Sequence, residues 1–215
     1  MDKTNAIRRT IFIIDDDEDV RRALGRLMRS AGWAVESFPD AQEFLLRLPY
    51  DDVGCVLLDM QMPGMTGPEL QERMHAIGVS LPIIYLTGHA DVPTSISVMK
   101  NGAMDILLKP AADDLVLEAI SSAIARHASI KDDDSKRVEI ETRVSRLSLR
   151  EREVMQLVIG GRLNKQIAGD LGISEKTVKA HRARVMEKLE TRSVAELVRM
   201  CFSVGIEPRA LDSVQ

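Results

Sequence analysis

Between residues 10 and about 127, short apolar runs alternate with stretches whose apolar residues recur at helical spacing. The runs are TIFII at 10–14, WAVES at 33–37, GCVLLD at 54–59, PIIYLT at 82–87 and MDILLK at 104–109. Three of them are apolar without alternation, which is typical of strands covered on both faces. The helical stretches carry apolar residues such as Leu24, Leu27, Met28, Ile96 and Met99. This pattern predicts an α/β domain with an open, doubly wound, five-stranded parallel sheet.

From residue 145 onward the strand pattern stops. Helical stretches are predicted at about 149–158, 164–171, 175–189 and 193–202. Ser148 and Ser174 are predicted N-caps, and Glu151, three residues after Ser148, completes a capping box. Four short helices in so few residues predict a small, compact all-α domain. The intervening segment 128–144 is highly charged and has few apolar residues, which predicts a solvated helical connector.

The charge of the chain separates these two regions. The formal net charge is -4, but residues 1–127 hold 12 basic and 19 acidic residues, whereas residues 145–215 hold 13 basic and 9 acidic residues. The asymmetry favours two domains with different partners. No apolar run approaches the roughly 18 residues of a membrane span, and the N-terminus does not read as a signal peptide. Cys55 and Cys201 form neither a disulfide framework nor a zinc motif, so we expect two buried thiols in a reducing cytoplasm.

The predicted strands end in polar residues that suit a metal ion and a phosphoryl group. Asp15 and Asp16 follow the first strand, Asp59 ends the third, Thr87 the fourth and Lys109 the fifth. Ligands of such sheets bind outside the carboxyl ends of the strands, so these side chains are expected to converge. Clustered carboxylates favour a cation such as Mg²⁺, while a lysine and a hydroxyl suit a phosphoryl group.

Residues 8–127 resemble the receiver domain of two-component response regulators through the strings IIDDDEDVR, VLLDMQMPGMTGPEL, IIYLTGHAD and LLKP. The resemblance implies a receiver fold with strand order 2-1-3-4-5 and makes Asp59 the phosphoacceptor. It assigns the metal, Mg²⁺ with Mn²⁺ as an alternative, to Asp15, Asp16, Asp59 and the backbone carbonyl of Gln61. It makes Thr87 the switch hydroxyl and Lys109 the phosphate partner, with a cis peptide between Lys109 and Pro110.

Two positions depart from the receiver pattern. Ile106 stands where the family usually has an aromatic residue, and Ala111 stands where it commonly has phenylalanine. Both leave the phosphorylation chemistry intact but bring the usual coupling between threonine and the aromatic ring into question. Near Thr87, Tyr85 is expected to pack within its strand, and His89 is expected in a loop beside the site rather than in catalysis.

Residues 145–202 resemble the LuxR-type helix-turn-helix through the string LSLREREVMQLVIGGRLNKQIAGDLGISEKTVKAHRARVMEKL. The closer resemblance is to FixJ-type regulators, because the match continues past this string through SVAELVRM. In the helix at 175–189, Val178, Val185 and Leu189 fall on one face and are expected to be buried. The opposite face can enter a major groove. Lys179 is the expected base contact, with Ala180 and Ala183 allowing close approach. Phosphate contacts are expected from Lys165, Lys176, Thr177, Arg182 and Arg184. His181 suits either a phosphate contact or half-buried packing.

The chain is therefore expected to comprise a receiver at 8–127, a charged linker at 128–144 and a DNA-binding domain at 145–208. The predicted function is phosphorylation-dependent regulation of transcription, with no enzyme activity beyond the receiver's own phosphorylation and dephosphorylation. Expected partners are a sensor histidine kinase, promoter DNA, RNA polymerase and a second copy of the chain, bound through residues 92–106. Two alternatives stay open: a phosphatase or phosphotransferase with an aspartyl nucleophile, and a DNA-binding protein whose receiver works without phosphorylation.

Overall fold

The computed structural model describes residues 9–88 and 92–209. His89, which was expected in a loop beside Thr87, lies outside this part of the chain. The described residues divide into two compact units, one ending at Lys131 and the other beginning at Asp132. Within the described ranges, no helix combines the length and apolar character that a membrane crossing requires.

The first unit is built on a parallel sheet of five strands. They are β1 (Arg9–Ile14), β2 (Ala34–Phe38), β3 (Val53–Asp59), β4 (Ile83–Thr87) and β5 (Asp105–Leu108). Their order is β2-β1-β3-β4-β5, which confirms the predicted fold class and strand order. Asp59 is in register with Leu86, and Thr87 is in register with Leu108. The carboxyl ends of β3, β4 and β5 therefore meet at one edge of the sheet.

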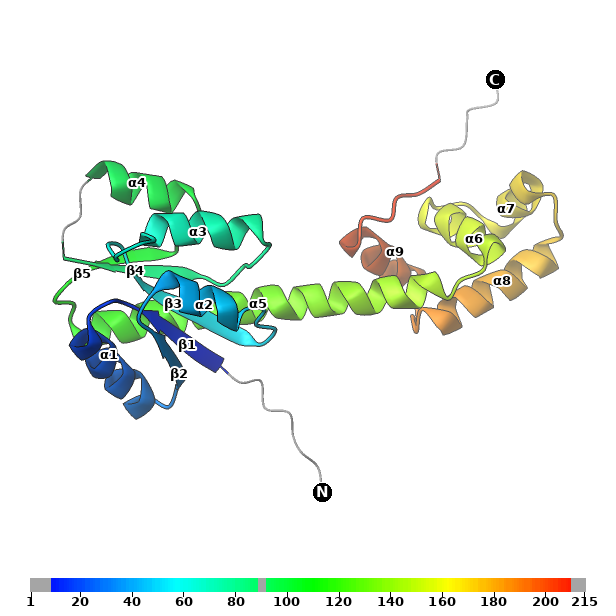
Figure 1. The fold of residues 1–215 in the computed structure, drawn as a ribbon. Helices are drawn as coiled ribbons and strands as arrows, with labels where there is room; N and C mark the ends of the chain where they lie inside the picture. The colour runs from blue at the N-terminus through cyan, green and yellow to red at the C-terminus, as the bar shows by residue number, and fades with distance from the viewer. Residues whose placement is uncertain (1–8, 89–91, 210–215) are drawn as a thin grey trace. The chain divides into compact units, whose positions relative to one another are not determined.

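Helices cover both faces of this sheet (Figure 1). They are α1 (Glu18–Ser30), α2 (Ala41–Arg47), α3 (Gly67–Ala76), α4 (Val92–Lys100) and α5 (Asp113–Ser145). Because side chains alternate along a strand, Ile11 and Ile13 pack with residues of α1 and α5, whereas Phe12 and Ile14 pack with residues of α2, α3 and α4. Cys55 lies in this core as a buried free thiol, as the sequence indicated.

Helix α4 buries only part of its apolar residues. Val98 is buried, but Ile96 is 50% exposed and Met99 45% exposed. At 100° per residue, Val98 points almost opposite to Ile96, so the apolar residues occupy two faces rather than one. Val92, which precedes Ile96 by four residues, is also exposed. One face of α4 therefore anchors the helix, and the other presents an apolar strip to solvent.

Helix α5 runs without interruption from Asp113 to Ser145 and so includes the charged segment 128–144. No glycine or proline occurs between Pro110 and Gly160, which leaves the sequence without a helix breaker in this stretch. Salt bridges at i,i+4 spacing, such as Lys136–Asp132 and Arg137–Glu141, line its exposed surface. In the second unit, Val144 from the last turn of α5 is part of the apolar core.

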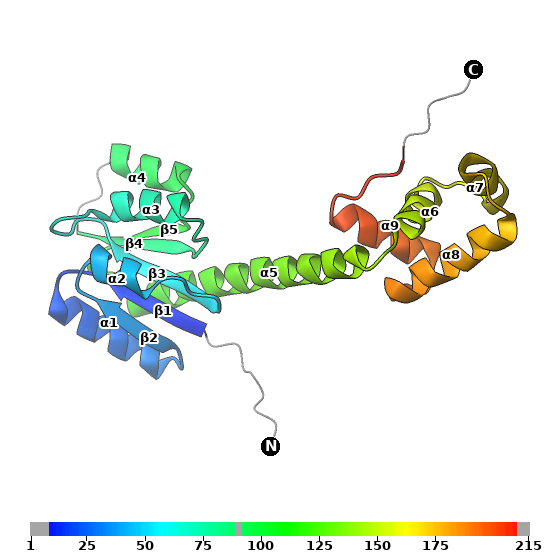
Figure 2. The same cartoon turned by 45° about the vertical axis from the view of Figure 1, so that its right-hand side comes forward.

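The second unit contains α6 (Leu149–Ile159), α7 (Asn164–Leu171), α8 (Glu175–Lys188) and α9 (Val194–Ser203), gathered around one apolar core (Figure 2). The predicted capping box is present, with Ser148 and Glu151 bonded reciprocally. Ser174 caps α8 as expected. Gly172 adopts a φ of 63°, which ends α7 in the left-handed region where glycine is favoured. This turn sets α8 against the rest of the helix-turn-helix.

Candidate functional site

Three carboxylates gather at the carboxyl edge of the sheet. Oxygen atoms of Asp15, Asp16 and Asp59 all lie within 4.8 Å of one another. Asp15 and Asp59 are buried, whereas Asp16 is exposed. Asp15 and Asp16 follow β1, and Asp59 is the last residue of β3, which lies beside β1. Neighbouring strand ends thus bring together the carboxylates that the sequence singled out.

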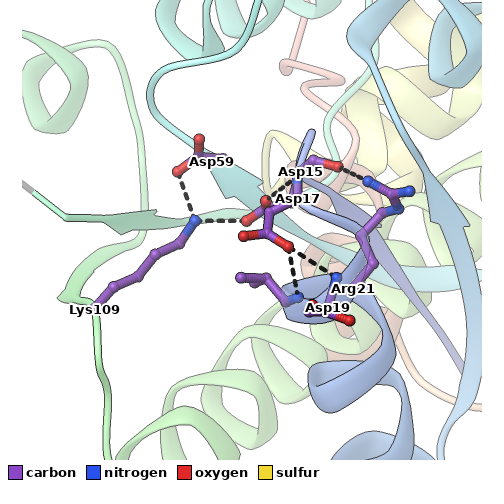
Figure 3. A network of polar contacts seen from close by, with 7 residues as sticks. Asp15, Asp17, Asp19, Arg21, Asp59 and Lys109 are labelled. Atoms are coloured by element: carbon purple, nitrogen blue, oxygen red, sulfur yellow. Dashed lines mark hydrogen bonds and ion pairs between the residues drawn. The ribbon is translucent and has the colours of Figure 1, made fainter.

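Lys109 lies between two of these carboxylates (Figure 3). Its Nζ atom donates to Oδ2 of Asp15 at 2.6 Å and to Oδ1 of Asp59 at 2.9 Å. The peptide between Lys109 and Pro110 is cis, as the resemblance implied. The backbone N–H of Lys109 donates to the carbonyl of Thr87 at 2.8 Å, which fixes the end of β5 beside the end of β4. The side chain thereby enters the acidic pocket.

Burial and charge act in opposite directions on these groups. Desolvation raises the pKa of Asp59 above its usual value, and the hydrogen bond and charge of Lys109 offset only part of this effect. Desolvation acts to lower the pKa of Lys109, but its contacts with Asp15 and Asp59 outweigh it, so the pKa of the ammonium group is raised. Lys109 is therefore charged at neutral pH and neutralises part of the pocket.

Backbone contacts hold the first acidic residue in place. Oδ1 of Asp15 accepts the backbone N–H of Asp17 at 2.9 Å. The guanidinium of Arg21 donates to the backbone carbonyl of Asp15 at 2.6 Å, and Asp17 caps the N-terminus of α1 (Figure 3). The role of Arg21 was not predicted from the sequence. Its only signal was its place in the string IIDDDEDVR, because a contact over six residues follows neither helical nor strand periodicity.

Gly67 allows the start of α3 to lie close to the backbone of Asp59. A Cβ atom on Gly67 would lie 2.5 Å from the backbone oxygen of Asp59 and 2.8 Å from the ring of Tyr85. The N–H of Gly67 donates to the carbonyl of Met60, which closes the loop after β3. Gln61 lies in this loop and is exposed. The start of α3 therefore constrains the backbone on which Asp59 sits.

The residues of β4 and β5 near the acidic pocket differ in burial. Thr87 is buried at the end of β4. Tyr85 is fully buried and donates to Oε1 of Gln71 at 2.9 Å, which agrees with its expected packing role. Ile106 and Ala111 are both half-buried, and neither is an aromatic residue.

The donor set of the acidic pocket fits a small divalent cation. Carboxylate and carbonyl oxygens are the ligands that Mg²⁺ takes, and this ion usually binds through few protein groups and retains water. Asp16 is exposed and can contribute an oxygen without losing a contact in the core. Like charges at this spacing repel one another, and a cation among them relieves that repulsion.

In the second unit, α8 has one buried face and one accessible face. Val178, Val185 and Leu189 are buried, as predicted. The accessible residues include nearly all of those proposed from the sequence for DNA contact, namely Lys176, Thr177, Lys179, Ala180, Ala183 and Arg184. Lys165 is exposed on α7. The accessible face is therefore basic and contains two small residues.

Arg182 and His181 differ from their neighbours. Arg182 is half-buried, and its guanidinium donates to Oδ1 of Asn164 at 2.6 Å, which ties α8 to the start of α7. Asn164 was not singled out in the sequence, because two residues 18 positions apart on separate helices share no local pattern. His181 is half-buried, and its Nδ1 is buried without a hydrogen-bond partner among the described residues.

Each of the two units matches a known protein family. The family described as "Response regulator receiver domain" matches residues 11–121, and the family described as "Bacterial regulatory proteins, luxR family" matches residues 145–201. The chain belongs to the LuxR-type response regulators. It is a transcriptional regulator that joins a receiver to a LuxR-type DNA-binding domain, as the sequence predicted. Both matched families are regulatory.

Several relatives align with this response regulator over nearly its whole length. The transcriptional regulatory protein FixJ of Bradyrhizobium diazoefficiens is 43% identical over 91% of this chain and 96% of its own length. The response regulator protein TodT of Pseudomonas putida is 38% identical over 88% of this chain and 84% of its own. Among solved structures, the response regulator StyR is 44% identical, with a TM-score of 0.85 over 91% of this chain and 98% of its own.

Proposed function

We propose that Asp59 accepts a phosphoryl group from a phosphohistidine of a sensor histidine kinase. A carboxylate oxygen of Asp59 attacks phosphorus in line, the bond between phosphorus and the imidazole nitrogen breaks, and an aspartyl phosphate forms. Lys109 neutralises charge on the transferred group, and the hydroxyl of Thr87 donates to one of its oxygens. Mg²⁺, or Mn²⁺, held by Asp15, Asp16, Asp59 and the carbonyl of Gln61, supplies further charge neutralisation when bound.

One observation carries this proposal: the Nζ of Lys109 lies within hydrogen-bond distance of Asp15 and Asp59 at once. Catalysis of phosphoryl transfer consists mainly of positioning and charge neutralisation. A cation that bridges the nucleophile and a prospective metal ligand supplies both. By contrast, neither a helix N-cap nor a solvated acidic loop requires a lysine at the end of β5, two strands away from β3 in the sheet.

The direct test is phosphorylation by acetyl phosphate with Mg²⁺, followed by intact-mass measurement. The wild-type chain is expected to gain one phosphoryl group, and Asp59→Asn none. Asp51→Asn, which removes an exposed carboxylate before β3, serves as the matched control and is expected to behave as wild type. Full phosphorylation of Asp59→Asn would refute the assignment. Omission of Mg²⁺ is expected to abolish the gain in the wild type.

We further propose that α8 reads promoter DNA through its accessible face. Lys179 contacts base edges, and Ala180 and Ala183 let the helix approach the groove. Phosphates are bound by Lys165, Lys176, Thr177 and Arg184, and by Arg182 in addition to its contact with Asn164. Lys179→Ala is expected to relax sequence preference. Lys176→Ala is expected to weaken binding to all sequences alike and to reduce the salt dependence by about one phosphate contact.

Phosphorylation is proposed to favour a dimer through residues 92–106. The exposed apolar strip of α4, formed by Val92, Ile96 and Met99, supports the proposal that this surface is a dimer interface. Two DNA-binding domains held together read two half-sites, and the second contact gains from a high effective concentration. A mutant with Ile96→Asp is expected to stay monomeric after phosphorylation in light-scattering measurements. We place the protein in the bacterial cytoplasm, where kinase, promoter and RNA polymerase are accessible to it.

A second candidate mode is DNA binding without phosphorylation. It is favoured by Ile106 and Ala111, because neither side chain provides the aromatic group that usually couples to the threonine. This mode predicts the same promoter affinity in wild type and Asp59→Asn, with or without acetyl phosphate. A phosphodonor-dependent gain in affinity would exclude it.

A further inference from the structure

The last turns of α5 belong to the second unit, which begins at Asp132. Val144, in the last turn of this helix, and Leu147, just after it, are buried in the same apolar core as Leu189, the C-cap residue of α8. The C-terminal end of the charged segment is therefore part of the fold that carries α8.

Polar contacts run in both directions between the end of α5 and the end of α8. The guanidinium of Arg143 contacts the carboxylate of Glu190 at 3.1 Å and donates to the backbone carbonyl of Leu189 at 3.5 Å. In return, the Nζ of Lys188 donates to the carbonyl of Arg146 at 3.2 Å. A cation at the C-terminus of a helix is favoured by the helix dipole and by the carbonyls that lack partners there. Arg143 thus caps α8 from a different helix.

Glu190 has a backbone conformation that favours glycine. Its φ is 55°, the only positive value of a non-glycine residue in the described part of the chain. The N–H of Thr191 donates to the carbonyl of Met186 at 3.0 Å, which completes a helix-ending turn that usually has glycine at this position. Glutamate costs more backbone strain here than glycine would. What it adds is a carboxylate for Arg143, whose side chain is only 20% exposed.

We propose that Arg143 is a positioning residue for DNA recognition and that it acts through Glu190 and the end of α8. Nearer its start, α8 is fixed separately by Arg182, which contacts Asn164. Held at both points, the helix keeps the orientation in which Lys179 meets base edges, so this inference rests on the proposed reading of DNA by α8. Hydrogen bonds to bases depend steeply on geometry, whereas long basic side chains reach phosphates over a range of orientations. Arg143 therefore affects discrimination between sequences.

The test measures two affinities of the full chain treated with acetyl phosphate and Mg²⁺, by fluorescence anisotropy. One is for a short duplex that the wild type selects from a random pool, and the other is for a random-sequence duplex. Arg143→Gln removes a positive charge and Glu190→Gly a negative one, so their affinities for random DNA are expected to change in opposite directions. The ratio of the two affinities is expected to fall in both variants, about two- to fivefold, as for the loss of a partly exposed ion pair. The double variant is expected to fall no further than either single variant.

Stability separates positioning from a merely structural role. Glu190→Gly relieves backbone strain, so urea unfolding followed by circular dichroism is expected to show a second unit at least as stable as in the wild type. A lower affinity ratio at undiminished stability is the result that positioning requires. Arg137→Gln is the matched control, because Arg137 pairs with Glu141 within α5 and its loss is expected to leave the ratio unchanged.

Lys179→Ala distinguishes failure of this inference from failure of the proposed function. A wild-type ratio in both Arg143→Gln and Glu190→Gly, beside a lower ratio in Lys179→Ala, would overturn the role of Arg143 alone. A wild-type ratio in all three variants would refute the reading of DNA by α8 and this inference with it.

Discussion

The Nζ of Lys109 lies 2.9 Å from Oδ1 of Asp59, although Lys109 follows β5, Asp59 ends β3, and β4 separates these two strands in the sheet. The lysine side chain therefore reaches across a strand to contact the proposed nucleophile. Only 26% of the Lys109 side chain and 11% of the Asp59 side chain are exposed, so water screens their interaction weakly. This contact makes Lys109 the residue whose loss is most directly expected to change the chemistry of Asp59.

Lys109→Met is expected to keep the fold and lose most of the phosphorylation. The methionine retains an apolar stem of similar length but leaves Asp15 and Asp59 without their shared cation. Acetyl phosphate should then modify Asp59 at least about tenfold more slowly, as expected for the loss of a charged contact. The measurement is the initial rate by intact mass. Lys136→Met removes an exposed lysine and serves as control; a rate for Lys109→Met equal to that control would refute the role.

Gly67→Ala is expected to destabilise the receiver and to slow phosphorylation. The added Cβ atom would lie 2.5 Å from the backbone oxygen of Asp59, so the loop after β3 must shift. Overpacking of this kind costs about 1 to 3 kcal/mol. Trp33, the only tryptophan of the chain, reports urea unfolding of the receiver by fluorescence.

Gly25→Ala provides a matched control for this experiment. There the nearest atom to the new Cβ is the end of the flexible Arg29 side chain, which can move aside. Alanine also restricts the unfolded chain, so unchanged or slightly higher stability is expected. Equal unfolding midpoints for the two variants would contradict the proposed constraint at Gly67.

The sheet and the convergence of the acidic residues could be predicted because both follow from local patterns. Continuous apolar runs marked the buried strands, and the polar residue after each run marked its carboxyl end. Parallel strands bring those ends to one edge, which is why Asp15, Asp16 and Asp59 lie close together.

Contacts without a local pattern could not be predicted. The bond from Arg21 to the carbonyl of Asp15 depends on the backbone path of one turn, and Arg182–Asn164 depends on how two helices cross. The exposed strip of α4 was missed for another reason. Apolar spacing alone does not say which face a sheet covers, and Ile96 and Val98 point in nearly opposite directions.

Glu151 is expected to make the stability of the DNA-binding domain depend on acidity. Its side chain is 4% exposed and lies 2.6 Å from the Nζ of Lys188. The hydrogen bond to Lys188, followed by that from the Ser148 backbone, lowers the pKa of Glu151 from 4.5 to about 2. The ionised form is thus favoured by folding. Its stabilising contribution is complete above pH 4.5 and is lost as the pH falls toward about 2.

Glu151→Gln isolates this contribution, because glutamine keeps the capping box but removes the charge. At neutral pH we expect a loss of about 1 to 2 kcal/mol in the free energy of unfolding, measured by circular dichroism in urea. The difference from wild type should shrink as the pH falls below 4.5. Glu153→Gln, two residues away and more exposed, should show a smaller difference. A difference for Glu151→Gln that stays constant between neutral pH and pH 3 would contradict this account.

Arg182→Met is expected to reduce both stability and DNA affinity. Its guanidinium donates to Asn164, so its loss frees a half-buried acceptor as well as removing a positive charge from α8. Arg184→Met removes a charge from an exposed position and is expected to reduce DNA affinity alone. Urea unfolding beside a DNA-binding titration separates the two effects. Equal stability of the two variants would show that the bond to Asn164 contributes nothing measurable.

Phosphorylation of Asp59 is proposed to control promoter binding. It is tested most directly by genome-wide footprinting of the wild type beside Asp59→Asn, each with its sensor kinase active. We expect a defined set of occupied promoters in the wild type and the loss or strong reduction of this set in Asp59→Asn, with both proteins present at the same level. Identical footprints in the two strains would contradict it.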